Sequence, residues 1–114
     1  MENDRELLSE AYRDFNARRI DELIARLHPE VIWPNGMQGG YVHGHGGVRD
    51  YWTRQWAIVD PHVEPLQIER DTAGRFVVKV HQVVRDLEGN QIADTIVHHS
   101  YEISDGLITR MDIE

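Results

Sequence analysis

The chain has 114 residues, of which 40% are hydrophobic and 28% charged, which is typical of a single folded domain over residues 1–114. A net charge of −8 argues against a nucleic-acid partner, and the lack of cysteine excludes disulfides and thiol chemistry. No stretch is apolar for the roughly 18 residues of a membrane span, and the acidic start is unlike a signal peptide, so we expect a cytoplasmic protein that does not bind membranes.

Two helices are predicted at the start of the chain. Residues 2–19 carry apolar side chains at helical spacing, and Asn3 followed by Glu6 fits a capping box. The next helix has Asp21 as a possible N-cap and ends before Pro29, which disfavours helix in the residue before it. Its predicted apolar face consists of Ile20, Leu23, Ile24 and Leu27.

A short strand, a glycine-rich segment and a third helix follow. Residues 30–36 (EVIWPNG) predict a strand that ends in a turn, and six of the nine glycines lie between Gly36 and Gly47. Such glycines permit positive φ where the chain turns sharply. The third helix is expected from about His45 to residue 59, with one stripe formed by Val48, Trp52, Gln55 and Val59.

The remaining chain has a β pattern. Four strands rich in Val, Ile, Thr and Tyr, at 65–70, 75–86, 92–104 and 106–114, are separated by turn residues. Three helices before an antiparallel meander predict an α+β fold, in which the N-terminal helices pack on a curved, mostly antiparallel sheet.

Strand alternation predicts which side chains face the helices. In 75–86 the better core face contains one polar residue, Gln82, and in 92–104 it contains His99. If LEGN forms the hairpin tip, Gln82 pairs with Thr95 and His99 with Val78. The outward set then comprises Ile96, His98, Ser100 and Glu102, and regular alternation also places Asp112 outside.

The motif GYVHGHGGVRDYW (40–52) suggests two other sites. His43 and His45 could share a face if extended, but a catalytic zinc needs about three protein ligands, and no third is evident. The glycines lack the lysine and hydroxyl of a phosphate-binding loop. We therefore expect no bound metal, and a metal-dependent enzyme built on His43 and His45 is kept as a third hypothesis.

Three strings together resemble one protein family: YRDFNARRIDELIARLHPEVIW (12–33), GYVHGHGGVRDYW (40–52) and HHSYEISDGLITRMDIE (98–114). They are similar to the nuclear transport factor 2-like superfamily, within its SnoaL-like polyketide cyclase and ketosteroid isomerase branch. The resemblance implies a cone-shaped α+β barrel with a cystatin-like fold. It also implies a helix-lined pocket and a homodimer formed through the outer sheet face.

The resemblance transfers only part of the isomerase chemistry. The general-base aspartate of the isomerases falls on or near Asn35, and asparagine cannot accept a proton at neutral pH. The tyrosine that contributes to the isomerase oxyanion hole falls near Ala11, with Tyr12 one residue away, and the second acid falls on His99. A steroid isomerase mechanism is therefore not predicted.

His99 is the main candidate for chemistry, because the pKa of an inward histidine can be moved across neutrality by its environment. Its alternative is a core histidine hydrogen-bonded to a tyrosine or a backbone carbonyl. Gln82, Asn35 or Tyr12 would stabilise an oxyanion. The predicted ligand-binding residues are Tyr12, Phe15, Trp33, Tyr41, His43, Trp52, Trp56, Tyr101 and Met111.

These residues predict a pocket for a small apolar or aromatic molecule. The first hypothesis is a cofactor-free isomerase, cyclase or lyase-type enzyme that transfers a proton on a carbonyl compound. The second is a non-catalytic ligand-binding or dimerisation domain that uses the same pocket.

Overall fold

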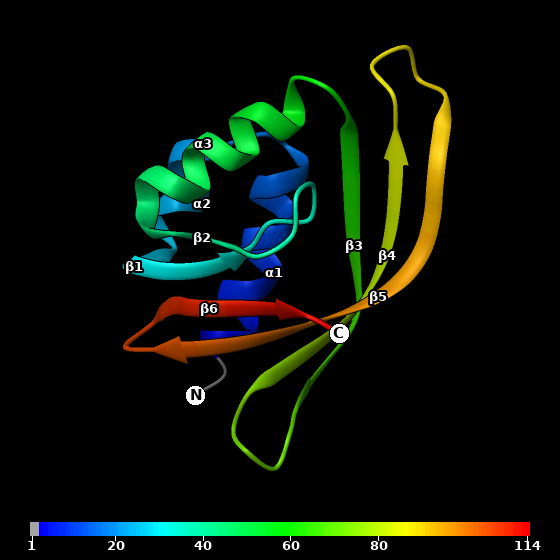
Figure 1. Ribbon diagram of the computed structural model, residues 1–114. Helices are drawn as coiled ribbons and strands as arrows, with labels where there is room; N and C mark the ends of the chain where they lie inside the picture. Colours follow the sequence, from blue (N-terminus) through cyan, green and yellow to red (C-terminus); the bar gives the residue numbers. More distant parts are fainter. Residues whose placement is uncertain (1–2) are drawn as a thin grey trace.

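The computed structural model describes residues 3–114, which form three helices and six strands (Figure 1). The helices are α1 (Asn3–Asn16), α2 (Ile20–Ala25) and α3 (Gly44–Trp56). The strands are β1 (Leu27–Pro34), β2 (Tyr41–His43), β3 (Asp60–Arg70), β4 (Phe76–Arg85), β5 (Gln91–Ser104) and β6 (Leu107–Ile113). Within residues 3–114, no helix is both long enough and apolar enough to span a membrane.

All six strands belong to one curved sheet in the order β2-β1-β6-β5-β4-β3. Every neighbouring pair is antiparallel except β1 and β6, which run parallel. The three helices lie on one side of this sheet (Figure 1). We call the side that they cover the inner face and the opposite side the outer face. The predicted α+β architecture is confirmed.

Strand alternation decides which side chains enter the core. On β4, Phe76, Val78 and Val80 are buried beneath the helices, as predicted. The hairpin register is also as predicted, because Val78 pairs with His99 and Gln82 pairs with Thr95. The core between the layers is completed by α1 and α3, which contribute residues such as Leu8, Val48 and Trp52.

Both ends of helix α2 differ from the prediction. Leu27 pairs with Ile108 of β6, so it belongs to β1 and not to the second helix. Pro29 consequently lies inside β1, and α2 already ends at Ala25. The N-cap of α2 is Arg19 and not Asp21, because the chain turns directly out of α1 through Arg18, whose φ is 60°.

Three further predictions about strand and helix boundaries, and one about the exposure of Ser100, were wrong. The glycine-rich segment contains a short strand, β2, which pairs with the end of β1. Helix α3 ends at Trp56, before Val59, and β3 starts at Asp60 rather than at Pro65. Ser100 does lie on the outer face, opposite Asp112, yet it is fully buried. The side chain of Arg75, which donates a hydrogen bond to the Ser100 carbonyl oxygen, lies beside it.

Candidate functional site

Two adjoining cavities lie between the helices and the inner face of the sheet. The smaller one has a volume of about 50 Å³, and the larger one has a volume of about 140 Å³. Both are lined by side chains from α1, α3, β1, β3 and β5, namely Phe15, Trp52, Trp33, Val63 and His99. Among the described residues that line either cavity there is no Asp, Glu, Lys or Arg. The described lining is therefore uncharged in both cavities: the smaller one is almost wholly apolar, whereas the larger one also has polar groups such as the side chains of Tyr51, Gln55 and Gln82.

Aromatic rings form most of the wall. The ring of Trp52 meets Trp33 edge-on at a centroid distance of 5.2 Å and Phe15 edge-on at 6.0 Å. Trp56 stacks against Trp52 at 6.1 Å, and Phe15 also contacts the Trp56 ring. Edge-on and stacked contacts of this kind add to the stabilisation from buried area alone. The three tryptophans of the chain thus gather at one place.

A chain of three buried polar side chains ends at the cavity. The Tyr101 hydroxyl lies 2.8 Å from the Tyr12 hydroxyl, which lies 2.8 Å from Nδ1 of His99. Tyr12 comes from α1, whereas His99 and Tyr101 face inward from alternate positions of β5. His99 is only 6% exposed, and it lines both cavities.

The burial of Tyr101 determines the direction of the hydrogen bonds in this chain. Within residues 3–114, the Tyr101 hydroxyl has only Tyr12 as a partner, so it donates its hydrogen to Tyr12. Tyr12 then donates to Nδ1 of His99, and the hydrogen of the neutral imidazole resides on Nε2. The reverse direction would leave a buried hydroxyl hydrogen without an acceptor, at a cost of about 1–3 kcal/mol.

The pKa shifts keep all three groups neutral. Burial, with a smaller contribution from the charge of His98, lowers the pKa of His99 to about 4. Burial is also the main cause that raises the pKa of Tyr12 and that of Tyr101 above their usual value. At neutral pH, His99 therefore presents an uncharged Nε2–H donor to the cavity, since no side chain of residues 3–114 bonds to this nitrogen.

The structure brings together most of the predicted site residues, both the catalytic candidates and the ligand-binding ones. Six of them line the smaller cavity: Tyr12, Phe15, Trp33, Trp52, His99 and Tyr101. Gln82 and Met111 line the larger cavity, and Trp56 lies behind Trp52. Their common feature in the sequence is an inward position on a strand or helix.

Three of the predicted site residues lie away from both cavities. Oδ1 of Asn35 accepts hydrogen bonds from the backbone N–H groups of Met37 and Gln38, so this side chain closes a turn. The Tyr41 hydroxyl donates to Asp112 at 2.7 Å, and His43 is exposed just before α3. Tyr41, His43 and Asn35 therefore do not line the cavities in this structure.

Sequence reasoning missed Tyr51 and Gln55 as cavity residues. The predicted stripe of Trp52 already contains Gln55, and Tyr51 lies one turn before Gln55 on α3, so the helical period could have indicated that both residues face the same surroundings.

The two histidines of the HxH motif serve no metal cluster here. Nε2 of His45 lies 2.8 Å from the carbonyl oxygen of Leu27, which ties the start of α3 to β1. Residues 3–114 contain no group of three or more His, Asp or Glu side chains placed to hold a metal ion.

The sequence of this chain matches a known domain family. Residues 8–111 match the SnoaL-like domain family. The chain belongs to this family. The resemblance predicted from the three sequence strings is thereby confirmed, whereas no curated protein matches the sequence.

Several solved structures share this fold. TerC, co-crystallised with polyporic acid, is 27% identical with a TM-score of 0.84, and the match covers 98% of this chain and 90% of TerC. An NTF2-like protein of unknown function from Burkholderia pseudomallei has 24% identity, a TM-score of 0.86 and coverages of 100% and 91%. A putative polyketide cyclase from Sinorhizobium meliloti has 17% identity, a TM-score of 0.81 and coverages of 96% and 94%. The last two comparisons establish the fold alone.

Proposed function

We propose that this SnoaL-like protein binds a small aromatic or apolar carbonyl compound in the inner-face cavity. The observation that carries the proposal is the hydrogen-bonded chain from Tyr101 through Tyr12 to His99, which ends in an aromatic cavity without charged side chains. Nε2–H of His99 would donate to the carbonyl oxygen. The co-crystallisation of the similar protein TerC with polyporic acid, a small aromatic ligand, supports this ligand class.

We extend the proposal to a cofactor-free isomerase, cyclase or lyase-type reaction. When such a compound enolises, the carbon beside its carbonyl gives a proton to water and the carbonyl oxygen gains negative charge, which a fixed donor stabilises most in the transition state. The Gln82 amide, which with His99 lines the larger of the two adjoining cavities, would supply a second donor. His99 itself would remove a proton only after reversal of the two tyrosine hydroxyls, which is unfavourable for Tyr101.

Binding is tested with two ligands of nearly equal shape, acetophenone and α-methylstyrene, titrated into ¹⁵N-labelled protein. The ketone oxygen can accept a hydrogen bond, whereas the methylene group that replaces it cannot. We expect the wild type to favour acetophenone by roughly threefold to tenfold, the value of one net hydrogen bond. The preference should vanish in His99→Leu and persist in His43→Gln, a variant of an exposed histidine. Equal binding of both ligands by the wild type would contradict the proposal.

Catalysis is distinguished from simple binding by isotope exchange. An enzyme that stabilises the enolate of acetophenone accelerates the exchange of its methyl hydrogens in D₂O. A rate equal to that in buffer, together with tight binding, would favour the non-catalytic ligand-binding domain. The lack of carboxylates among the described lining residues is the observation that keeps this second function open.

We also propose that two copies associate through the outer face of the sheet. Ile96 is half exposed there, between polar neighbours, as is common at protein interfaces. Light scattering after gel filtration should find a dimer, and Ile96→Lys should yield monomers. Ile58→Lys, which changes another exposed isoleucine just after α3, should leave the dimer intact. A monomeric wild type would contradict this proposal.

A further inference from the structure

The hydroxyl of Tyr51 is a further polar group at the larger cavity, besides His99 and Gln82. Tyr51 lies in α3 and is 4% exposed. Its hydroxyl oxygen accepts a hydrogen bond from the backbone N–H of Gly36 at 3.0 Å and a longer one from the side-chain nitrogen of Gln55 at 3.4 Å. The residue therefore stands at the joint between α3 and the turn that follows β1.

These two contacts leave the hydroxyl with a hydrogen to give. A phenol has one hydrogen and two acceptor positions, and both acceptor positions are occupied by N–H groups. Among residues 3–114, no acceptor takes the hydrogen of Tyr51. Burial raises the pKa of this phenol, so it keeps its hydrogen at neutral pH. Tyr51 is thus held as a donor at the cavity wall.

Gly36 makes this arrangement possible. A Cβ atom at position 36 would lie 3.2 Å from the Tyr51 hydroxyl oxygen, closer than most side-chain contacts allow. The hydroxyl would then have to move away from the backbone N–H that positions it.

The larger cavity consequently has two donors of the same kind. Tyr51 and His99 both line it, each with its acceptor position already occupied by a protein donor. A volume of about 140 Å³ is similar to that of an engineered apolar cavity that binds benzene, so it suits one small ring. No charged side chain among the described lining residues would repel or pair with the ligand's own oxygens.

We propose that Tyr51 is a specificity-determining residue, and that the preferred ligand is a single-ring compound with two oxygen acceptors, one for His99 and one for Tyr51. This inference rests on the proposed function, because it takes the carbonyl held by His99 as given. It adds the second acceptor and the residue that recognises it.

The test compares 1,4-diacetylbenzene, which has two carbonyls, with acetophenone, which has one, by NMR titration. Tyr51→Phe should weaken the binding of the diketone by roughly threefold to tenfold and that of acetophenone by less than about twofold. Gly36→Ala, which keeps every cavity side chain, should give the same selective loss. Tyr41→Phe, which removes a hydroxyl bonded to Asp112, is the matched control and should change neither affinity.

Two results would overturn the role of Tyr51. An equal loss for both ligands in Tyr51→Phe would mean that the residue only supports the cavity, and no loss for either would mean that it makes no contact. Gly36→Ala decides the matter if Tyr51→Phe fails to fold. Failure of the wild type to bind either ketone would instead reject the proposed function and this inference with it.

Discussion

Polar side chains are buried and hydrogen-bonded on the inner face of the sheet but exposed to water on the outer face, and two adjacent histidines show this difference. His99 points inward, is 6% exposed and bonds to a buried tyrosine, whereas His98 points outward and is exposed. Strand alternation alone separates them. A histidine is therefore a neutral hydrogen-bond donor in the buried inner face and a surface side chain on the water-exposed outer face.

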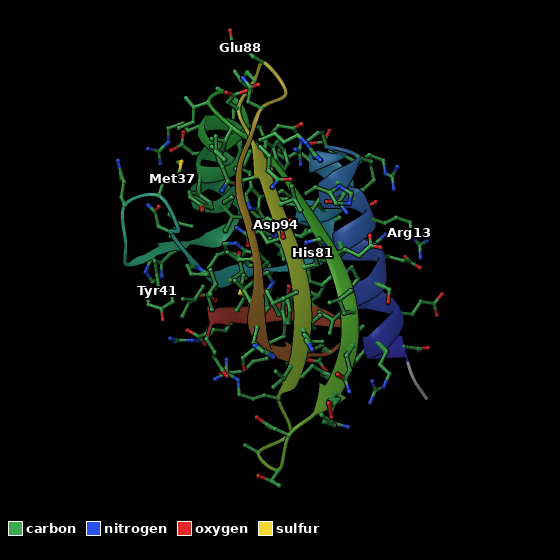
Figure 2. The ribbon with its side chains drawn as sticks, turned by 90° about the vertical axis from the view of Figure 1, so that its right-hand side faces the viewer. Arg13, Met37, Tyr41, His81, Glu88 and Asp94 are labelled. Carbon is green, nitrogen blue, oxygen red and sulfur yellow. The ribbon has the colours of Figure 1, made fainter. Side chains whose placement is uncertain are left out.

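The polar contacts of the outer face are mainly between charged side chains. Asp112 accepts hydrogen bonds from Tyr41, Arg75 and Arg110, and the Arg110 contact is the main cause that lowers the pKa of this carboxyl. Figure 2 shows another pair on the outer face, His81 and Asp94, whose side chains lie 2.7 Å apart. The inner face has hydroxyls, an imidazole and aromatic rings instead. Its contacts should be insensitive to salt and costly to remove.

The largest expected effect concerns packing at the inner face. Trp52→Ala removes a fully buried ring that contacts Phe15, Trp33 and Trp56, and should lower the free energy of unfolding by about 3–5 kcal/mol. Ile96→Ala on the outer face should change the stability of the monomer by less than about 0.5 kcal/mol. Urea denaturation measures both. Similar losses would show that the two faces do not differ in this way.

The pH dependence of stability tests the environment of His99. The unfolded imidazole takes up a proton below about 6.5, whereas the folded one does so only near 4, so the unfolded state binds more protons between these values. The contribution of His99 is complete above pH 6.5 and falls by about 3 kcal/mol as the pH drops from 6.5 to 4. His99→Gln should show a correspondingly weaker decline in unfolding free energy. If the unfolding free energies of wild type and variant changed in parallel with pH, His99 would be accessible to water in the folded protein, contrary to this account.

The removal of one hydroxyl from each face gives a smaller effect. Tyr12→Phe deprives the Tyr101 hydroxyl of its acceptor and Nδ1 of His99 of its donor, and should cost about 1–3 kcal/mol of unfolding free energy. Tyr41→Phe breaks a contact of a side chain that is 46% exposed, and should cost less than about 0.5 kcal/mol. The outcome that counts against the account is a larger cost for Tyr41→Phe, measured by thermal or urea denaturation.

The smallest effect is expected at the outer ion pairs. Asp112→Asn should lower the free energy of unfolding by about 1 kcal/mol, because the two arginines are only partly buried and solvent screens these pairs. The difference from wild type should shrink further in 1 M NaCl. A loss that is large and independent of salt would indicate that this network is buried, for example by a second copy of the chain.

The sequence predicted the parts of this molecule that follow from periodicity. The inward positions of His99, Gln82 and Phe76 come from the two-residue repeat of strands, and the register of β4 with β5 comes from the short turn between them. The positions of Asn35 and Tyr41 were harder to predict. Asn35 uses its side chain for a local turn, and Tyr41 belongs to a three-residue strand too short to show a pattern.

The hydrogen-bonded chain was only partly predictable. Inward positions were assigned to His99 and Tyr101, and a tyrosine partner for His99 was foreseen as one alternative. The contact with Tyr12 depends on how α1 packs across the sheet, over 87 residues of sequence separation, which no local pattern encodes. The same holds for Tyr51, whose role depends on a turn between β1 and β2.

The hydrogen position on the His99 ring is the most direct test of the proposed site. Nitrogen NMR of the ring at neutral pH, with and without acetophenone, reports which nitrogen carries hydrogen and which responds to the ligand. We predict a neutral ring with its hydrogen on Nε2. Nδ1 should carry no hydrogen and accept a hydrogen bond from Tyr12, and the ligand should shift the Nε2 signal. A charged ring, hydrogen on Nδ1, or an Nε2 signal that ignores bound ketone would contradict the donor role of His99.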